Sequence, residues 1–228
     1  MSKVLRFLIS ISFIILILLS SIDLFSFDRT FYQKEYQKLG VPEVIKIDVN
    51  ELMLVTDALL DYTAGQRDDL TIEAIIDGAS RQVFNDKEIT HMKDVAVLYQ
   101  NAMFVRNSAL LVLLVCIIIA YKSKLKDFRL LLVHTYNQVS LVFTLFVGTI
   151  LMIAVIDFTW FWTNFHHVFF SNDLWLLNPK TDILIMMVPE QFFFDLTFRI
   201  IIGFLSVFIL SNIFAYYQYR KLLKDERS

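Results

Sequence analysis

The chain has 228 residues, of which 57% are hydrophobic, and its formal net charge is −2. Its mean hydropathy is +0.58, whereas the apolar share of soluble domains, glycine included, is about 45–50%. The composition therefore excludes an ordinary soluble protein and predicts an integral membrane protein. The single cysteine, Cys116, lies in an apolar stretch, which excludes a disulfide framework, a cysteine-based metal site and a thiol protease.

Four apolar stretches approach the roughly 20 residues that a helix needs to cross a bilayer. We predict a mainly α-helical membrane protein with four transmembrane helices and a small extracellular cap that contains helices and a β-hairpin. Because no A-x-A-like cleavage site follows Leu19, the first stretch is expected to be an uncleaved anchor. The expected segments are transmembrane helix 1 (1–22), cap (23–101), transmembrane helix 2 (102–121), cytoplasmic loop (122–132), transmembrane helix 3 (133–156), extracellular aromatic-rich loop (157–197), transmembrane helix 4 (198–217) and cytoplasmic tail (218–228).

Positive charge is distributed unevenly among the segments that connect the spans. The positive-inside rule places segments rich in Lys and Arg in the cytoplasm. Both termini and the short loop are therefore expected to be cytoplasmic, and the cap and the aromatic-rich loop extracellular. The residues that carry this prediction are Lys3 and Arg6, then Lys122, Lys124, Lys126 and Arg129, and finally Arg220, Lys221, Lys224 and Arg227.

The cap begins with two predicted helices. The first covers Arg29–Leu39 and ends at Gly40, a usual helix stop. The second follows Asp48, which forms a capping-box pattern with Glu51, and its apolar face continues to Gly65.

A hairpin and a long helix follow in the sequence. Leu70–Ile76 and Ala79–Phe84 flank the dipeptide Asp77-Gly78, which is favoured in tight hairpin turns. Asn85 with Glu88 repeats the capping-box pattern, so one helix is expected to run from there into the second span.

His91 lies on this long helix, on the same face as Glu88 and Val95 by the i, i+3, i+4 rule. Asp94 is one turn away and is expected to orient the imidazole. Further along, Pro189 followed by glutamate is typical of the first turn of the helix that becomes the fourth span.

Two histidines are expected at similar depth at the outer side of the spans. His91 precedes the second span by about ten residues and His166 follows the third by about ten, which is roughly 15 Å of helical rise. They are candidates for an acid–base pair; alternatively, each hydrogen-bonds a carboxylate or carbonyl in a purely structural role. Neighbouring His167 must point elsewhere, and His134 is expected at the cytoplasmic interface. Zinc held by His91, His166 and Asp173 is a further alternative, but no H-E-x-x-H pattern supports it, so we expect no metal and no cofactor.

Several polar residues are embedded in the aromatic-rich loop, where an unpaired carboxylate is costly. Arg106 and Arg199 are the expected partners, and an interfacial aromatic belt would account for the Phe and Trp residues. Nucleophile-elbow, Walker and dinucleotide motifs do not occur, which excludes serine catalysis through that motif and nucleotide use. The polar and amphipathic residues concerned are Asn172, Asp173, Trp175, Asp182 and Glu190.

Two long strings carry a family resemblance. FNDKEITHMKDVAVLY (Phe84–Tyr99) and NFHHVFFSNDLWLLNPKTDILIMMVPEQFF (Asn164–Phe193), with LLDYTAG around Tyr62, resemble the lipoprotein intramolecular transacylases (Lit) of Gram-positive bacteria. The resemblance implies four transmembrane helices under an extracellular cap in the bacterial cell membrane, and it assigns catalytic roles to His91 and His166. It implies transfer of the sn-2 acyl chain of a diacylglyceryl group to the α-amine of the lipoprotein's N-terminal cysteine, giving the lyso-form.

On this hypothesis the partners are a diacylglyceryl-modified lipoprotein and the lipid bilayer, with no nucleic acid and no nucleotide. His91 and His166 would share the roles of base and acid, Asp94 would orient His91, and Asn172 would donate to the developing oxyanion. A membrane lipid or lipoprotein esterase, or a non-catalytic membrane sensor or scaffold with a partner-binding cap, are the alternatives. The remaining supporting or substrate-shaping candidates are Tyr62, Asp173, Trp175, Asp182 and Glu190.

Overall fold

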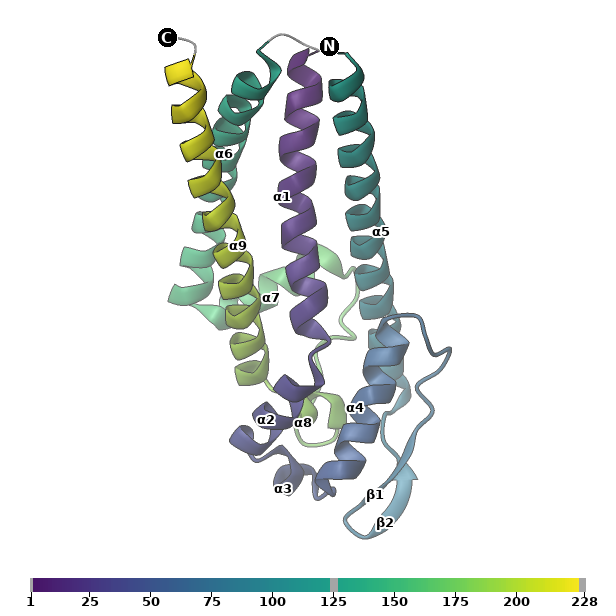
Figure 1. The fold of residues 1–228 in the computed structure, drawn as a ribbon. Coiled ribbons are helices and arrows are strands. Elements are labelled where there is room, and N and C mark those ends of the chain that lie inside the picture. The colour runs from purple at the N-terminus through teal and green to yellow at the C-terminus, as the bar shows by residue number, and fades with distance from the viewer. Residues whose placement is uncertain (1, 124–126, 226–228) are drawn as a thin grey trace. The chain divides into compact units, whose positions relative to one another are not determined.

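The computed structural model describes residues 2–123 and 127–225, which form two compact units (Figure 1). The helical unit contains residues up to Asp23, from Met103 to Asp157, and from Arg199 onward. The cap unit contains Leu24–Ala102 and Phe158–Phe198. Lys124, Lys126 and Arg227, three of the predicted cytoplasmic cations, lie outside the described residues.

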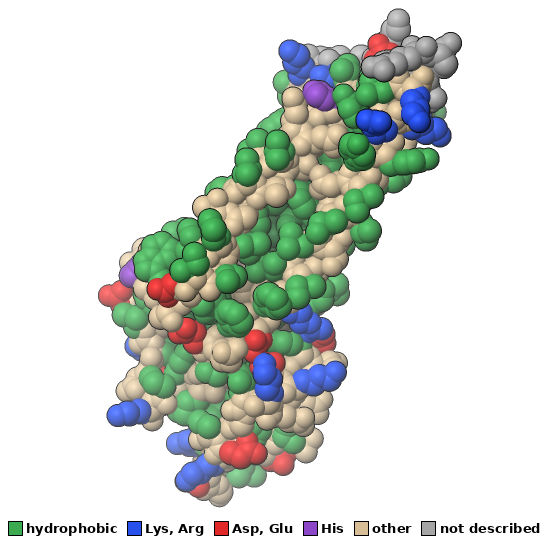
Figure 2. Space-filling view, turned by 90° about the vertical axis from the view of Figure 1, so that its left-hand side faces the viewer, with side chains coloured by type: hydrophobic (Ala, Val, Ile, Leu, Met, Phe, Trp, Pro, Cys, Tyr) green, Lys and Arg blue, Asp and Glu red, His purple; other side chains and the backbone are tan. Residues whose placement is uncertain are grey.

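Four long helices supply the helical unit: α1 (Ser2–Ser26), α5 (Asp86–Lys122), α6 (Phe128–Ile156) and α9 (Glu190–Asp225). Each is long and apolar enough to cross a membrane, which confirms the predicted four-span membrane fold. Figure 2 shows a face on which the side chains over the long helices are mostly hydrophobic. Exposed leucine, valine and phenylalanine on α6 and α9 are what a helix in contact with lipid requires.

Helix α1 contacts the other three helices of this unit through two hydrophobic clusters. The cluster with α6 and α9 contains Ile14, Ile17, Tyr136, Phe204, Phe208 and Ala215. The cluster with α5 contains Leu5, Ile9, Leu113 and Cys116. Two polar contacts add to the packing of α6 on α9, since Tyr136 Oη lies 2.6 Å from Ser211 Oγ and Ser140 Oγ donates to Asn212 Oδ1 at 2.6 Å.

Arg106 does not have the partner that the sequence suggests. It forms an ion pair with Asp23 of α1, within the helical unit, and not with a carboxylate of the aromatic-rich loop. The prediction is wrong because Arg106, in the middle of α5, is paired by a neighbouring helix, which sequence spacing does not reveal.

The cap unit begins with α2 (Arg29–Leu39), α3 (Val41–Ile45) and α4 (Val49–Thr63). The predicted end of α2 at Gly40 is confirmed, since this residue has a φ of +65° and occupies the left-handed region that glycine enters at little cost. Tyr36 of α2 is fully buried, and its hydroxyl lies 2.9 Å from Thr56 Oγ1 of α4. Phe192, at the start of α9, stacks on Tyr36 and joins this segment to the same core.

The predicted hairpin is present but shorter than expected. Its strands, β1 (Glu73–Ile76) and β2 (Ala79–Gln82), pair in antiparallel register with Ile76 opposite Ala79. Asp77 and Gly78 both have positive φ, as a two-residue type I′ turn requires.

The two predicted capping boxes have different outcomes. Asn85 Oδ1 accepts from Glu88 N and Glu88 Oε2 accepts from Asn85 N, so the second box is confirmed. At the first, Asp48 caps Asn50 N, but Glu51 Oε2 accepts from Ile75 N of β1 at 2.6 Å and ties the hairpin to α4.

The segment predicted as an aromatic-rich loop contains two helices, α7 (Phe158–Phe169) and α8 (Ile183–Met187), before α9 begins at Glu190. The sequence analysis did not identify these two helices in the segment that connects the third and fourth spans. Asp157 has an extended backbone, with φ −148° and ψ 91°, so α6 ends there and the aromatic run that follows forms a separate helix.

Candidate active site

Two histidine side chains face each other inside the cap unit. His91 lies in the second turn of α5, and His166 lies in the last turn of α7. The ring centroids are 6.2 Å apart with an interplanar angle of 34°, and the residues are only 7% and 6% exposed. Two titratable rings shielded from water at this spacing are suited to shared proton transfer on one bound group.

The tautomer of His166 follows from its hydrogen bond. His166 Nδ1 lies 2.7 Å from the carbonyl oxygen of Trp162, one turn earlier in α7. A carbonyl only accepts, so Nδ1 carries the proton and donates, and Nε2 of the neutral ring is the nitrogen with a free lone pair.

Aromatic rings enclose the His166 imidazole. Trp175 stacks on it at 4.7 Å and 26°, and Trp162 meets it edge-on at 4.7 Å. Phe170 contacts both imidazoles, with centroid distances of 5.4 Å to His91 and 5.6 Å to His166. This enclosure separates the pair from solvent and supplies an apolar surface of the kind that an acyl chain contacts.

Burial lowers the pKa of His166 from its ordinary value of 6.5. The hydrogen bond to Trp162 opposes this shift, and the nearby His167 adds to it. The neutral imidazole is therefore the main form at pH 7. As the sequence predicts, adjacent His167 points elsewhere: its side chain is exposed and packs edge-on against Trp175.

His91 is held by packing. Its Nδ1 is buried and has no hydrogen-bond partner among the described residues. The sequence predicts Asp94 as its orienting group, but Asp94 Oδ2 accepts a hydrogen bond from Asn172 Nδ2 at 2.9 Å. Asn172 Oδ1 accepts in turn from Leu174 N, so the α5 carboxylate holds the turn that follows α7.

The other predicted site residues lie in different surroundings. Asp173 is exposed, which removes the expected need for a partner. Buried Asp182 accepts from Asn85 Nδ2, Asn178 N and Thr181 Oγ1, and the backbone hydrogen bond from Asn178 is the main cause of its lowered pKa.

Tyr62 and Glu190 complete the predicted set. Glu190 is exposed and accepts from Thr159 Oγ1 at 2.6 Å. Tyr62 is half-buried in the last turns of α4. The hydrogen bonds and ring contacts of the described residues join neither of them to the histidine pair, whereas they join Trp175 to it directly.

Residues 2–123 and 127–225 contain no group of three or more His, Cys, Asp or Glu side chains placed to hold a metal ion. Asp173, the third ligand in the zinc alternative, is an exposed side chain, unlike the two buried histidines.

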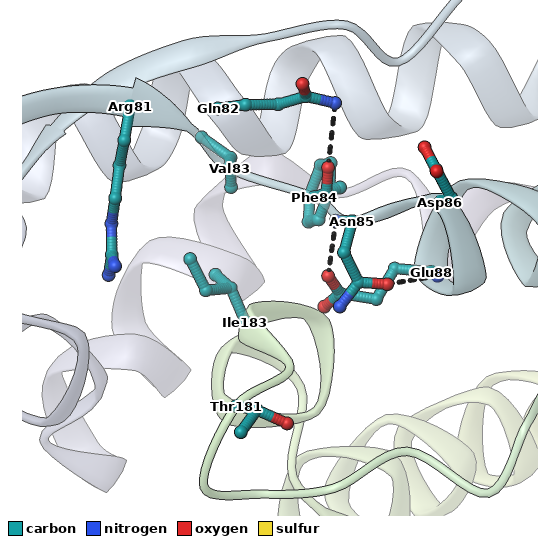
Figure 3. Close-up of a pocket in the computed structure, with 9 residues that line it drawn as sticks. All are labelled: Arg81, Gln82, Val83, Phe84, Asn85, Asp86, Glu88, Thr181 and Ile183. Carbon is teal, nitrogen blue, oxygen red and sulfur yellow. Dashed lines mark hydrogen bonds between the residues drawn. The ribbon is translucent and has the colours of Figure 1, made fainter.

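A pocket of about 350 Å³ lies between the end of the hairpin, the start of α5 and the segment that enters α8 (Figure 3). Its lining includes Glu88, which is one helical turn from His91, but neither histidine. The lining residues are Arg81, Gln82, Val83, Phe84, Asn85, Asp86, Glu88, Thr181 and Ile183.

Glu88 has a second role that the sequence does not reveal. It is 1% exposed, and its Oε1 accepts from Leu184 N of α8 at 2.6 Å while Oε2 completes the capping box. The sequence offered one signal for this role: Glu88 lies on the same helix face as His91, so it was expected to be buried, and a buried carboxylate needs further donors. Phe170, which packs on both imidazoles, was also missed, because a single phenylalanine in an aromatic run carries no distinguishing pattern.

Comparison with known proteins identifies the family. The family model for "Lipoprotein intramolecular transacylase Lit" matches residues 7–193. No curated protein sequence matches the chain.

Solved structures of the membrane integral lipoprotein intramolecular transacylase Lit from Bacillus cereus have the same fold. One has a TM-score of 0.76 at 23% identity and covers 100% of this chain and 98% of the other. Two variants, with a histidine replaced by arginine or by alanine, have TM-scores of 0.71 at 22% identity and cover 100% of this chain and 94% and 96% of theirs. Because the family model matches well over half of the sequence, this multi-pass membrane protein belongs to the lipoprotein intramolecular transacylase (Lit) family and is an acyltransferase.

Proposed function

We propose that this protein moves the sn-2 acyl chain of the S-diacylglyceryl group on a lipoprotein's N-terminal cysteine to the α-amine of that cysteine, giving the lyso-form lipoprotein. The observation that carries the proposal is the pair of buried imidazoles of His91 and His166, 6.2 Å apart and enclosed by aromatic rings. Membership of the Lit family supports the same reaction class.

The reaction needs two proton movements and no enzyme nucleophile. The α-ammonium loses a proton before its nitrogen attacks the ester carbonyl carbon, and the sn-2 oxygen gains a proton when its bond to that carbon breaks. We assign His91 and His166 jointly as base and acid for these transfers. Of the three ammonium protons, one stays on the amide nitrogen, one equivalent reaches the new hydroxyl and one is released.

Confinement of the substrate supplies the remaining part of the rate. Donor ester and acceptor amine belong to one molecule, and holding two such groups in reacting geometry contributes about 7–11 kcal/mol in favourable cases. The aromatic rings around His166 are suited to confine the acyl chain next to the imidazoles.

The proposed reaction and the charge distribution support one placement in the membrane. We propose that the protein lies in the bacterial cell membrane with both termini in the cytoplasm and the cap unit outside, where the N-terminal cysteine of a lipoprotein is presented. The segment boundaries of the sequence analysis, with the cap and the residues after the third span facing outward, belong to this proposal.

Tandem mass spectrometry of the N-terminal lipopeptide from a model diacylated lipoprotein tests the function. We expect incubation with the protein in membranes to give an isomer of unchanged mass with one acyl chain on the cysteine nitrogen. Loss of a chain would instead identify an esterase, and gain of a chain an intermolecular acyltransferase. A lipopeptide left unaltered would favour a non-catalytic protein.

The pH dependence of kcat/KM is expected to show an acid limb with a midpoint below 6.5. The pKa of His166 is lowered by burial, so the ring stays neutral and able to accept a proton until the pH falls through that lowered value. The measurement is the rate of isomer formation across pH 4.5–8. A rate that rises as the pH falls through this range would make His166 the proton donor.

His167→Gln is the matched variant for the acid limb. The charge of His167 lowers the pKa of His166, so its removal is expected to move the midpoint upward. The substrate's own α-amine, with a pKa of about 8, is the same in both experiments and does not contribute to the difference.

Asn172→Ala is expected to lower kcat by about 100-fold, the usual cost of losing one oxyanion donor. Within the described residues the Asn172 amide nitrogen donates one hydrogen bond, to Asp94 Oδ2, and we assign its second N–H to the oxyanion. Asp94→Ala is the control, because it removes the hydrogen bond between Asp94 and Asn172 and leaves the Asn172 amide in place. If kcat falls equally in the two variants, Asn172 acts only by holding the turn through Asp94. If kcat of Asn172→Ala is unchanged, Asn172 has no part in the mechanism.

A further inference from the structure

Among the described residues, the indole of Trp175 has a buried polar atom without a hydrogen-bond partner. Its Nε1 is shielded from solvent and makes no hydrogen bond within the described residues, although the rest of the side chain is only half-buried. Buried donors without an acceptor are rare in folded proteins because each is destabilising. One explanation for such a donor at a functional site is that its acceptor belongs to the substrate.

The Trp175 indole lies next to the proposed catalytic pair. The indole stacks on the His166 imidazole at 4.7 Å and 26°. Both Trp175 Nε1–H and His166 Nε2 point within the planes of their rings, so near-parallel rings direct them past the edges of the stack. A substrate group that binds either atom therefore lies beside the stack and not above or below it.

A second buried atom without a partner among the described residues belongs to another ring next to the same imidazole. His91 Nδ1 is also buried without a partner among the described residues, and the His91 ring is 6.2 Å from that of His166. The unpartnered atoms of Trp175 and His91 therefore belong to two rings that neighbour His166. Both atoms therefore belong to rings whose centroids lie within 6.2 Å of the His166 ring.

We infer that the indole N–H of Trp175 donates a hydrogen bond to the carbonyl oxygen of the migrating acyl group as it becomes an oxyanion. This inference rests on the proposed function. When the amine nitrogen bonds to the ester carbon, the carbonyl π electrons move to the oxygen, and the indole donates to that oxygen. When the tetrahedral intermediate collapses, the carbonyl re-forms, the bond to the sn-2 oxygen breaks and that oxygen takes a proton from the histidine pair.

Trp175 and Asn172 would then supply two donors to one oxyanion from the same short segment after α7. Two hydrogen bonds hold this segment: Asn172 Oδ1 accepts from Leu174 N, and Lys87 Nζ of α5 donates to the Leu176 carbonyl. A donor that is fixed before the reaction loses little freedom when charge develops, which is the condition for effective oxyanion stabilisation.

Trp175→Phe tests the inference by kinetics, since phenylalanine keeps an aromatic ring against His166 and removes the N–H. We expect kcat for acyl migration to fall about 100-fold, with little change in KM and in the acid limb that His166 sets. Trp160→Phe is the matched control: Trp160 is 53% exposed on α7, and its variant is expected to retain the wild-type rate.

A second readout follows the indole itself. The protein has three tryptophans, so 15N-tryptophan labelling gives three indole signals, which the single Phe variants assign. A phosphonate analogue of the tetrahedral intermediate is expected to shift the Trp175 indole proton downfield and to leave that of Trp160 unchanged. A purely structural tryptophan would not respond in this way.

The outcomes separate this inference from the proposed function. A wild-type protein that produces no isomer would overturn both. An active wild type with a Trp175→Phe variant within threefold of it, or with an unmoved Trp175 signal at saturating analogue, would overturn the role of Trp175 alone.

Discussion

Replacing His166 by alanine is expected to lower the rate of acyl migration by about 10³-fold, and replacing His91 by a similar factor. Positioned acids and bases contribute about 10²–10⁴-fold each, and both imidazoles are buried next to each other with no other titratable ring inside the enclosure formed by the described residues. The rate of formation of the equal-mass isomer, measured by tandem mass spectrometry, reports the loss.

A variant that lacks both histidines tests whether they act as a unit. Groups that act as a unit give strongly non-additive losses, so His91→Ala with His166→Ala is expected to be little slower than either single variant. His167→Ala is the control, since His167 is adjacent in sequence but exposed, and it is expected to retain most of the activity at pH 7.5.

Multiplied losses in the double variant would mean that the two histidines act independently. Wild-type activity in both single variants would leave the imidazoles as structural groups and would exclude the two-histidine mechanism.

Replacing Glu88 by alanine is expected to destabilise the protein by about 3 kcal/mol, because hydrogen bonds to a charged group contribute about 1.5–3 kcal/mol each. Glu88 is 1% exposed and accepts from both Asn85 N and Leu184 N. Its loss removes the capping box of α5 and detaches the first turn of α8. Denaturant unfolding in detergent, followed by near-ultraviolet circular dichroism, measures the change.

Glu88→Gln separates the two contributions. Glutamine keeps the volume and one acceptor oxygen, so a loss of about half that of alanine is expected. Glu43→Gln, at an exposed position on α3, is the control and is expected to have an effect within about 0.5 kcal/mol. If Glu88→Gln and Glu88→Ala are equally destabilising, the acceptor oxygen that glutamine keeps contributes nothing, and the hydrogen bond to the other oxygen accounts for the entire effect.

Local features of this protein were predictable from its sequence. The four spans follow from the length of the apolar runs, and the Asn85–Glu88 box forms because both partners lie within one helical turn. The hairpin turn at Asp77-Gly78 likewise depends on the backbone preferences of two adjacent residues. In each case the energy that selects the structure comes from neighbours in the chain.

Features that depend on distant contacts were not predictable. Asp94 bonds to Asn172 and not to His91, and Glu51 bonds to Ile75 instead of closing its own box. A carboxylate accepts from whichever donor packing brings within reach, and residue spacing does not rank donors that lie tens of positions away.

The membrane class and the face that His91 shares with Glu88 were readable from residue order alone, and so was the candidacy of His166 as a partner for His91. The 6.2 Å between the two rings, the tautomer that Trp162 imposes on His166 and the Trp175 ring stacked on it became visible only in the folded protein. Periodicity and capping act over a few residues, whereas the site is assembled by side-chain packing between α5, α7 and the segment that follows α7.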